Sequence, residues 1–285
     1  MVTEWGKRLY VQILGHVQVL SGKDLVLPSP RLARLLLGSL ALRANRTIGH
    51  DQLRYVLWGD RVPKSAAANL RGYLAELRRL LRSATGITLE TDPTGLRLSA
   101  VPEAVDVLLF DSLATEGHRL LSEGRAEPAS ERLGQALSLW RGPVMDAMVV
   151  PEPLQAEAQV LELKRQDAVE GSVDARLALG RHRELIVELT LHVAQWPLRE
   201  RLCGQLMLAL CRSGRQVEAL SAYQALRARL DEDLGVMPNA DLQLLYRRML
   251  RADPNLHYPS GRVCRGWCPD GGVIAGPLPD RGCRS

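Results

Sequence analysis

An internal repeat constrains the fold of this chain more than any other feature of its sequence. Three segments of similar pattern begin at Gly124, Gly180 and Gly214. They read "GRAEPASERLGQALSLW", "GRHRELIVELTLHVAQW" and "GRQVEALSAYQALRARL". The last two glycines are 34 residues apart, the period of tetratricopeptide helix pairs, while the 56 residues between the first two imply an insertion. Residues 101–252 are therefore predicted to form an all-α, tetratricopeptide-like repeat domain.

One position of the repeat supports this prediction. It lies near the end of each quoted segment and holds Trp140, Trp196 or Leu230. A large apolar side chain at a repeated position is expected in the core between helices. The alternative is that these side chains form part of a cage around a ligand. Stacked helix pairs form a concave surface for protein partners and carry no catalytic chemistry of their own.

Residues 1–100 follow a different pattern. The stretch "RLYVQILGHVQVLSGKDLVLPSP" alternates apolar and polar residues, which predicts two or three short antiparallel strands. Ser29 and Pro30 are typical of a helix start, in which the Ser29 side chain would cap the helix, and helices are expected over 31–45, 50–60 and 65–81. The stretch "ITLETDPTGLRLS" that follows is expected to be a hairpin. A sheet, three helices and a hairpin is the order of a winged helix-turn-helix domain, whose third helix enters the major groove of DNA.

The third of these helices, "SAAANLRGYLAELRRLL", separates its apolar and basic residues. At helical spacing Leu70, Leu74, Leu77 and Leu81 form one stripe, as expected of a helix packed on a core. An adjoining arc carries arginines and small residues, which would let a flat anionic partner come close. The arc comprises Arg71, Arg78, Arg79 and Arg82, with Ala68, Gly72 and Ala75 between them. The alternative for this helix alone is a solvated basic face.

The charge of the chain is divided between its two halves. Residues 1–100 hold 15 Lys and Arg against 7 Asp and Glu, a net of +8, within a total of +5. Residues 101–252 hold 18 against 22, a net of −4. A basic first domain followed by a mildly acidic one indicates a nucleic-acid-binding domain joined to a domain with a different function.

Several classes of protein are disfavoured by the sequence. We expect no membrane span and no signal peptide, because no apolar run is long enough and the N-terminus lacks the required layout. We find no metal-binding pair of histidines on a helix, no phosphate-binding loop and no nucleophile elbow, so neither an enzyme nor a bound cofactor or metal is expected. Cys203 and Cys211 lie in leucine-rich helical patterns, which favours free thiols in a reducing cytoplasm. As a DNA-binding protein it would associate there with the nucleoid.

The last segment, residues 253–285, is rich in Gly and Pro and is predicted to be disordered. It contains Cys264, Cys268 and Cys283 together with His257. Their spacing matches no common zinc pattern, so a metal cluster is not expected there.

The ordered part of the chain also resembles a known family. "ANRTI", "LWGDRVPKSAAANLRGYLAELRRLL" and "TGLRL" are similar to the OmpR-type winged helix of the Streptomyces antibiotic regulatory proteins. The stretch from "RLCGQLMLAL" to "LLYRRML" resembles the bacterial transcriptional activation domain that follows it in that family. The resemblance covers about residues 8–252. It implies a mainly α chain with a small β portion, in which the winged helix-turn-helix spans 1–100 and the helical repeat domain spans 101–252.

The resemblance also implies positions for DNA contacts. The groove-facing positions of the family correspond here to residues of the third helix, with one more position in the wing. These are Asn69, Arg71, Gly72, Tyr73, Ala75, Glu76 and Arg78, with Arg97 in the wing. By chemistry Arg71 suits guanine, Asn69 suits adenine or a phosphate, and Arg78, Arg79 and Arg82 suit phosphates. The loop before the helix, "WGDRVPKS", would face RNA polymerase through Asp60, Arg61 and Lys64, and Lys64 is also expected near DNA. Trp58 is expected beneath this loop.

The function implied by the resemblance is sequence-specific activation of transcription. Family members bind direct repeats in double-stranded DNA as two protomers side by side and recruit RNA polymerase holoenzyme to antibiotic or other secondary-metabolite genes. The alternative that the sequence leaves open is a helical-repeat adaptor between proteins, whose basic N-terminal domain does not read DNA.

Overall fold

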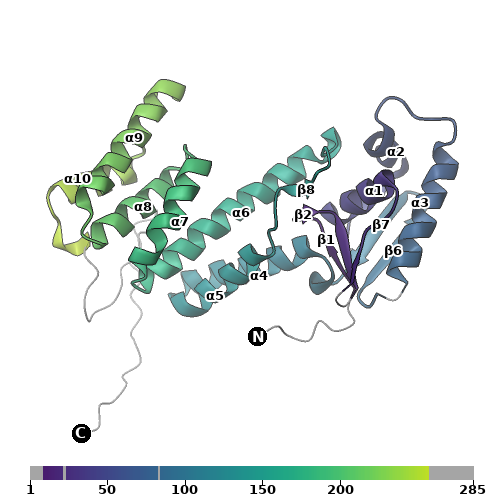
Figure 1. Ribbon diagram of the computed structural model, residues 1–285, viewed down its shortest axis with the longest axis horizontal. Helices are drawn as coiled ribbons and strands as arrows, with labels where there is room; N and C mark the ends of the chain where they lie inside the picture. The colour runs from purple at the N-terminus through teal and green to yellow at the C-terminus, as the bar shows by residue number, and fades with distance from the viewer. Residues whose placement is uncertain (1–8, 22–23, 83, 257–285) are drawn as a thin grey trace, which may run out of the picture. The chain divides into compact units, whose positions relative to one another are not determined.

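The structure is a computed structural model that describes residues 9–21, 24–82 and 84–256. It divides into two compact units (Figure 1). The first joins the chain up to Thr115 to Gln135–Gln166, and the second joins Glu116–Gly134 to the chain from Asp167. The first unit therefore contains the winged helix together with segments from beyond residue 100.

The first unit begins with a small antiparallel sheet in the strand order β1-β3-β4. Its strands are β1 (Leu9–Gln12), β3 (Gln18–Ser21) and β4 (Asp24–Val26), which confirms the strands predicted from alternation. Three helices follow, α1 (Arg31–Leu42), α2 (His50–Trp58) and α3 (Ala66–Leu81). The hairpin of β6 (Ile87–Asp92) and β7 (Gly95–Ala100) comes next, and β5 (Thr47–Gly49) pairs on the free side of β7. In Figure 1 α3 lies beside this hairpin, the arrangement of a winged helix-turn-helix.

The core of the winged helix is built from the apolar faces of these elements. Leu36 and Leu40 of α1, Ile48 of β5, Leu53 of α2 and Leu98 of β7 are all fully buried or within one per cent of it. Such a core holds the three helices in fixed register. Leu74 and Leu77 of α3 are buried as well, so packing places this helix in the domain.

Residues beyond 100 complete the same unit through polar and backbone contacts. The Asp106 carboxylate, at the start of α4 (Asp106–Ser122), accepts hydrogen bonds from the backbone N–H groups of Ile13 and Leu14, each at 2.8 Å. The guanidinium of Arg141 lies 3.3 Å from the same carboxylate. Burial raises the pKa of Asp106 to about 6, although the two N–H groups and Arg141 act in the opposite direction. A buried carboxylate from beyond residue 100 therefore binds the turn after β1.

A short strand reinforces this connection. β8 (Val144–Asp146) pairs in parallel with β2 (Gly15–His16), and the Met145 N–H donates to the carbonyl of Ile13 at 2.8 Å. Met145 is fully buried although its φ is +55°. Its terminal methyl packs against Gly38 of α1, where an added Cβ would come within 2.8 Å of it. On the α6 side, Arg43 donates to Glu157 at 2.6 Å and to the carbonyl of Pro153 at 2.8 Å.

The helices after residue 105 confirm the repeat. Gly124, Gly180 and Gly214 have φ values of +74°, +79° and +79°, and each lies in the turn between the two helices of a pair. Glycine tolerates this conformation at low cost, which explains its recurrence. The helices are α4 with α5 (Ala126–Ser138), α6 (Glu152–Ala178) with α7 (His182–Gln195), and α8 (Glu200–Arg212) with α9 (Gln216–Leu234), followed by α10 (Ala240–Leu250). β8 and the 27 residues of α6 account for the longer first interval.

The repeated apolar position is only partly in the core. Leu230 is buried, as predicted. Trp140 is half-buried and packs edge-to-face on Phe110, with ring centroids 5.4 Å apart, beneath the guanidinium of Arg165. Trp196 is also half-buried and stacks on His192 of the preceding turn, with centroids 5.2 Å apart. Trp196 therefore lies only partly in the core that was expected for it.

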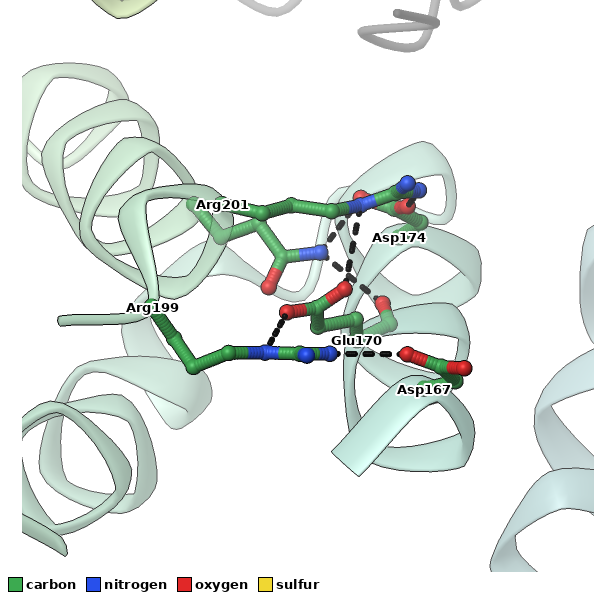
Figure 2. A network of polar contacts seen from close by, with 6 residues as sticks. Asp167, Glu170, Asp174, Arg199 and Arg201 are labelled. Carbon is green, nitrogen blue, oxygen red and sulfur yellow. Dashed lines mark hydrogen bonds and ion pairs between the residues drawn. The ribbon is translucent and has the colours of Figure 1, made fainter. Parts of the chain in front are cut away.

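The second unit contains a partly buried ionic network between α6 and the start of α8. Figure 2 shows Arg199 reaching both Glu170 and Asp167, and Arg201 reaching Glu170 and Asp174. The carboxylates recur at 167, 170 and 174, which places them on one face of α6. Charge pairs of this kind fix the register of two packed helices.

Three further expectations concern cysteines, the tail and membrane spans. Cys203 and Cys211 are free and buried in α8, as expected of small apolar residues. The tail with His257, Cys264, Cys268 and Cys283 lies outside the described residues. In the described part of the chain, no helix combines the length and apolar character needed to cross a membrane.

Candidate nucleic-acid interface

Helix α3 has one buried face and one exposed face, as the sequence predicts. Leu74, Leu77 and Leu81 are buried, and Leu70 is half-buried. The other face carries the arginines and small residues in the exposed positions. Its members are Arg71, Gly72, Ala75, Arg78, Arg79 and the flanking Arg82, hereafter the α3 face.

The arginines of the α3 face lack acidic partners in the part of the chain that the structure describes. Among the described residues no carboxylate forms an ion pair with Arg71, Arg78, Arg79 or Arg82. Gly72 lies between them, and a Cβ added there would meet no atom within 4 Å. The fold therefore leaves this face both positively charged and open, which suits a closely approaching anionic partner.

Two residues expected on this face are less accessible than their neighbours. Asn69 and Tyr73 are half-buried. The Asn69 side-chain amide donates to the Ser65 hydroxyl at 3.2 Å, one turn earlier. Asn69 is therefore held by the first turn of α3, and Tyr73 lies at the margin of the exposed arc.

Glu76 has a structural partner that the sequence analysis did not foresee. Its carboxylate accepts a hydrogen bond from the backbone N–H of Ser29 at 2.9 Å. Ser29 was expected to cap α1 with its side chain, but Pro30 is the N-cap residue and no side chain caps this helix. Glu76 thus links α3 to the segment before α1 and does not extend freely from the α3 face.

The wing is tied to α3 by Arg78. Its guanidinium donates to the hydroxyl of Thr91 on β6 at 2.7 Å, a contact that sequence reasoning missed. The turn at the tip is fixed by Asp92, whose carboxylate accepts hydrogen bonds from the hydroxyl and N–H of Thr94 and from the N–H of Gly95. The bonds from Thr94 lower the pKa of Asp92 below its usual value. The wing is therefore an ordered hairpin.

Arg97 lies in the body of the wing and not at its tip. It is an exposed residue of β7, the central strand of the β5-β7-β6 sheet. Thr47 and Glu90 are its partners on the neighbouring strands. The adjacent Leu96 and Leu98 point into the core and are fully buried. Arg97 is accessible, and Glu90 is the carboxylate nearest to it in the register.

The loop between α2 and α3 presents its charges to solvent. Asp60, Arg61 and Lys64 are all exposed. The chain turns at Gly59, which has a φ of +58°, and the Ala66 N–H donates to the carbonyl of Pro63 at 2.9 Å. Trp58, the last residue of α2 before this loop, is half-buried and lines a groove between α2 and α3.

Comparison with known proteins extends this picture to nearly the whole ordered chain. Residues 105–250 match the bacterial transcriptional activator domain. The chain is 36% identical over 256 residues to the regulatory protein DnrI of Streptomyces peucetius, covering 87% of this chain and 94% of that protein. It is also 36% identical over 249 residues to the regulatory protein AfsR of Streptomyces griseus, but spans only 25% of that larger protein.

A solved structure is similar over the same part of the chain. Mycobacterium tuberculosis EmbR in complex with a low affinity phosphopeptide has a TM-score of 0.81 and 34% sequence identity, covering 87% of this chain and 66% of that chain. The matches to DnrI, AfsR and EmbR are to proteins named as regulators and not as enzymes, and they include the winged helix as well as the repeats. This chain therefore belongs to the Streptomyces antibiotic regulatory protein family of transcriptional activators.

Proposed function

We propose that this protein activates transcription by binding specific double-stranded DNA through the α3 face. The observation that carries the proposal is a continuous exposed arc with four arginines, none of which forms an ion pair with a described carboxylate. Gly72 and Ala75 lie within that arc and leave room for a close partner. DNA phosphates and base edges in the major groove supply both the negative charge and the flat surface.

The residues of the α3 face have different roles in this proposal. Arg71, on the second turn of the helix, reads a guanine through its two-pronged guanidinium. Arg79 and Arg82 anchor phosphates, and Arg78 anchors a phosphate while held by Thr91. Arg97 contributes from the sheet of the wing, and Lys64 from the loop before α3. Asn69 and Tyr73 contact DNA at the margin of the interface.

A gel-shift titration of the full chain tests the proposal. The promoter region nearest its own gene and a random duplex of equal length are compared over a series of salt concentrations. We expect tighter binding to the promoter and an affinity that falls steeply with salt, with a logarithmic slope of about −0.9 for each neutralised phosphate. Failure to bind any duplex would contradict the proposal and favour the adaptor function.

We further propose that two protomers bind direct repeats side by side and recruit RNA polymerase holoenzyme to genes of secondary metabolism, antibiotic pathways included. The family membership supports this part, and the exposed charges of the loop between α2 and α3 offer a surface for the polymerase. Asp60→Ala combined with Arg61→Ala tests it, because exposed interface charges guide a partner without supporting the core. DNA affinity should stay within a few-fold while transcription in vitro is largely lost.

The two measurements are made on one preparation of the variant protein. If affinity and transcription fall together, the loop serves DNA binding, and the polymerase contact lies elsewhere on the chain. If neither changes, the loop contacts neither partner.

A further inference from the structure

A groove of about 380 Å³ lies within the first unit, between α1, the end of α2 and the segment that precedes α6. Its lining includes Leu32 and Leu35 of α1, Tyr55 of α2, and Met148 and Val149 of that segment, and it is hereafter the α1 groove. The volume is within the range of small-molecule sites, about 300 to 1,000 Å³. No residue of the α3 face lines this groove, so the proposed DNA contacts give it no role.

The α1 groove exposes large apolar side chains to solvent. Val149 is 78% exposed and Tyr55 is 41% exposed. Leu32, Leu35 and Met148 are half-buried in the same lining. Apolar side chains scattered singly over a surface need no explanation, but those that gather around a concavity mark a site for an apolar partner. The groove therefore offers apolar surface to the body of a ligand.

The segment before α6 holds its shape at a cost in backbone energy. Met145 and Ala147 have φ values of +55° and +61°, which residues with a side chain rarely adopt. Met145 is fully buried, and its carbonyl accepts a hydrogen bond from the Met148 N–H at 3.0 Å, so the turn is fixed by packing and by its own backbone. Residues held in such conformations cluster at ligand clamps and switch regions. The groove thus has a rigid and strained wall next to Met148 and Val149.

The charges at the α1 groove favour an anion. Arg31, the first residue of α1, is exposed and forms no ion pair within the described part of the chain. Glu152 is the acidic residue of the lining, and it lies in the first turn of α6. A negative charge in that position interacts favourably with the N-terminus of its own helix. The Arg31 guanidinium is therefore the charge available to a ligand, and it suits a carboxylate.

We infer that the α1 groove binds a small apolar carboxylate, whose charged end contacts Arg31 and whose apolar body lies against Leu35, Tyr55 and Val149. The groove is built from the winged helix and from a segment beyond residue 100, so the ligand would contact both and stabilise their packing. The inference goes beyond the proposed function, because it needs no contact with DNA.

The first test uses two fluorescent probes on the full chain. Anilinonaphthalene sulfonate is an apolar anion, and phenylnaphthylamine has the same rings without the charge. Arg31→Gln should weaken binding of the anionic probe about tenfold, the loss expected for one charge-assisted hydrogen bond, and leave the neutral probe unchanged. Arg229→Gln removes an exposed arginine from α9 in the second unit and is the matched control, which should bind both probes like the wild type.

Val149 allows a test of both signs, because its side chain is exposed and neither replacement disturbs the core. Val149→Asp should weaken the anionic probe by at least about tenfold, since it removes apolar surface and adds a negative charge beside the ligand. Val149→Lys keeps an apolar stem and adds a positive charge, so it should tighten the anionic probe by a few-fold. Glu152→Gln should also tighten it, because one negative charge leaves the lining.

The second test identifies the class of ligand with decanoate and decylamine, which share one chain and differ in charge. Decanoate should displace the anionic probe from the wild type, and decylamine should not. Decanoate at about ten times its Kd should also raise the melting temperature by about 3 °C, because it binds only the folded chain. Arg31→Gln should lose most of this rise.

Each contrary result overturns the inference at a different step. If Arg31→Gln and Val149→Asp bind the anionic probe like the wild type, the fluorescence comes from another surface and the groove is not the site. If Arg31→Gln weakens both probes equally, the charge of Arg31 has no role and the anion is wrong. If decylamine displaces the probe and decanoate does not, the groove takes a cation through Glu152. None of these measurements involves DNA, so the proposed function is tested separately.

Discussion

The arginines of the α3 face and those of the second unit have different surroundings. In the second unit Arg176 donates to Glu188 at 2.6 Å, Arg181 to Glu127 at 2.8 Å and Arg199 to Asp167 at 2.7 Å. On the α3 face no described carboxylate pairs with an arginine. Net charge alone does not reveal this difference, because the residues after 100 also hold many arginines. An arginine with an acidic partner links two helices, whereas one without a partner is available to an external anion.

The comparison predicts that removing a partner from the second unit affects stability and not DNA binding. Glu170 is the most buried carboxylate of the network in Figure 2 and accepts from Arg199 at 3.0 Å. Glu170→Ala should lower the free energy of unfolding by about 3 kcal/mol, since it leaves two arginines with one carboxylate fewer between them. Urea melts of the full chain measure the loss. Glu170→Gln keeps an acceptor oxygen and should cost less. Equal losses in the two variants would show that the effect comes from the charge alone, and no loss in either would show that the network does not stabilise the fold.

Asp106 differs from the carboxylates of the second unit in its place, because it pairs with an arginine, Arg141, inside the first unit. Asp106→Ala leaves the N–H groups of Ile13 and Leu14 without an acceptor and should cost about 2 kcal/mol. The pKa of Asp106 is raised to about 6 in the folded chain, above its usual value near 3.8, so the folded state binds the proton more tightly. Its contribution to stability is therefore fully present below about pH 4 and is lost as the pH rises through 6.

The measurement is a set of urea melts between pH 4 and pH 7 for the wild type and Asp106→Asn. Asparagine keeps an acceptor oxygen but cannot ionise, so the variant should lack the fall in stability that Asp106 gives over this range. Parallel pH profiles for the two proteins would contradict the raised pKa. Any fragment that ends at residue 100 also lacks Asp106 and Met145, and it should be less stable than the full chain.

Variants of the α3 face should change DNA affinity and leave stability nearly unchanged, the reverse of what is expected for Glu170→Ala. Arg79→Ala should weaken promoter and random duplexes alike by about tenfold and reduce the salt slope by about 1, because it removes a phosphate contact. Its free energy of unfolding should stay within about 0.5 kcal/mol of the wild type, as for other exposed residues. Arg71→Ala is the matched variant and should cost about 1 to 3 kcal/mol at one base position in a binding-site selection. If their effects were exchanged, α3 would be rotated differently on the DNA.

The sequence predicts those features that have a local cause. The helix pairs follow from apolar periodicity and from glycines at positive φ, and the two faces of α3 follow from its spacing. Contacts across long stretches of chain leave no such pattern. Asp106 binds N–H groups 92 and 93 residues earlier, and Glu76 binds an N–H 47 residues earlier. Side-chain-to-backbone bonds of this kind depend on tertiary packing, so neither the division into units nor the contact of Glu76 with Ser29 could be inferred.

The smallest predicted effect is that of replacing Gly72. It separates the role of this residue in folding from its role in DNA binding, because stability and promoter affinity should change in opposite directions. Gly72 lies in the interior of α3 and an added Cβ would meet nothing within 4 Å, so packing does not require a glycine there. Glycine is less favourable than alanine in a helix interior by about 0.5 to 1 kcal/mol. Gly72→Ala should therefore stabilise the chain by about that amount. It should also weaken promoter binding under the proposed function, because the new methyl group adds volume to the exposed α3 face.

Gly134→Ala in α5 is the matched control, since a Cβ at that exposed helical position also meets nothing within 4 Å. It should give a similar gain in thermal and urea stability with no change in DNA affinity. If both variants are stabilised and both bind the promoter like the wild type, DNA does not approach α3 at Gly72, and the contacts must be made by the arginines at the edges of the α3 face. If only Gly72→Ala loses affinity, the glycine is retained for the interface at a cost to the stability of its own helix, as expected of a residue placed for binding and not for folding.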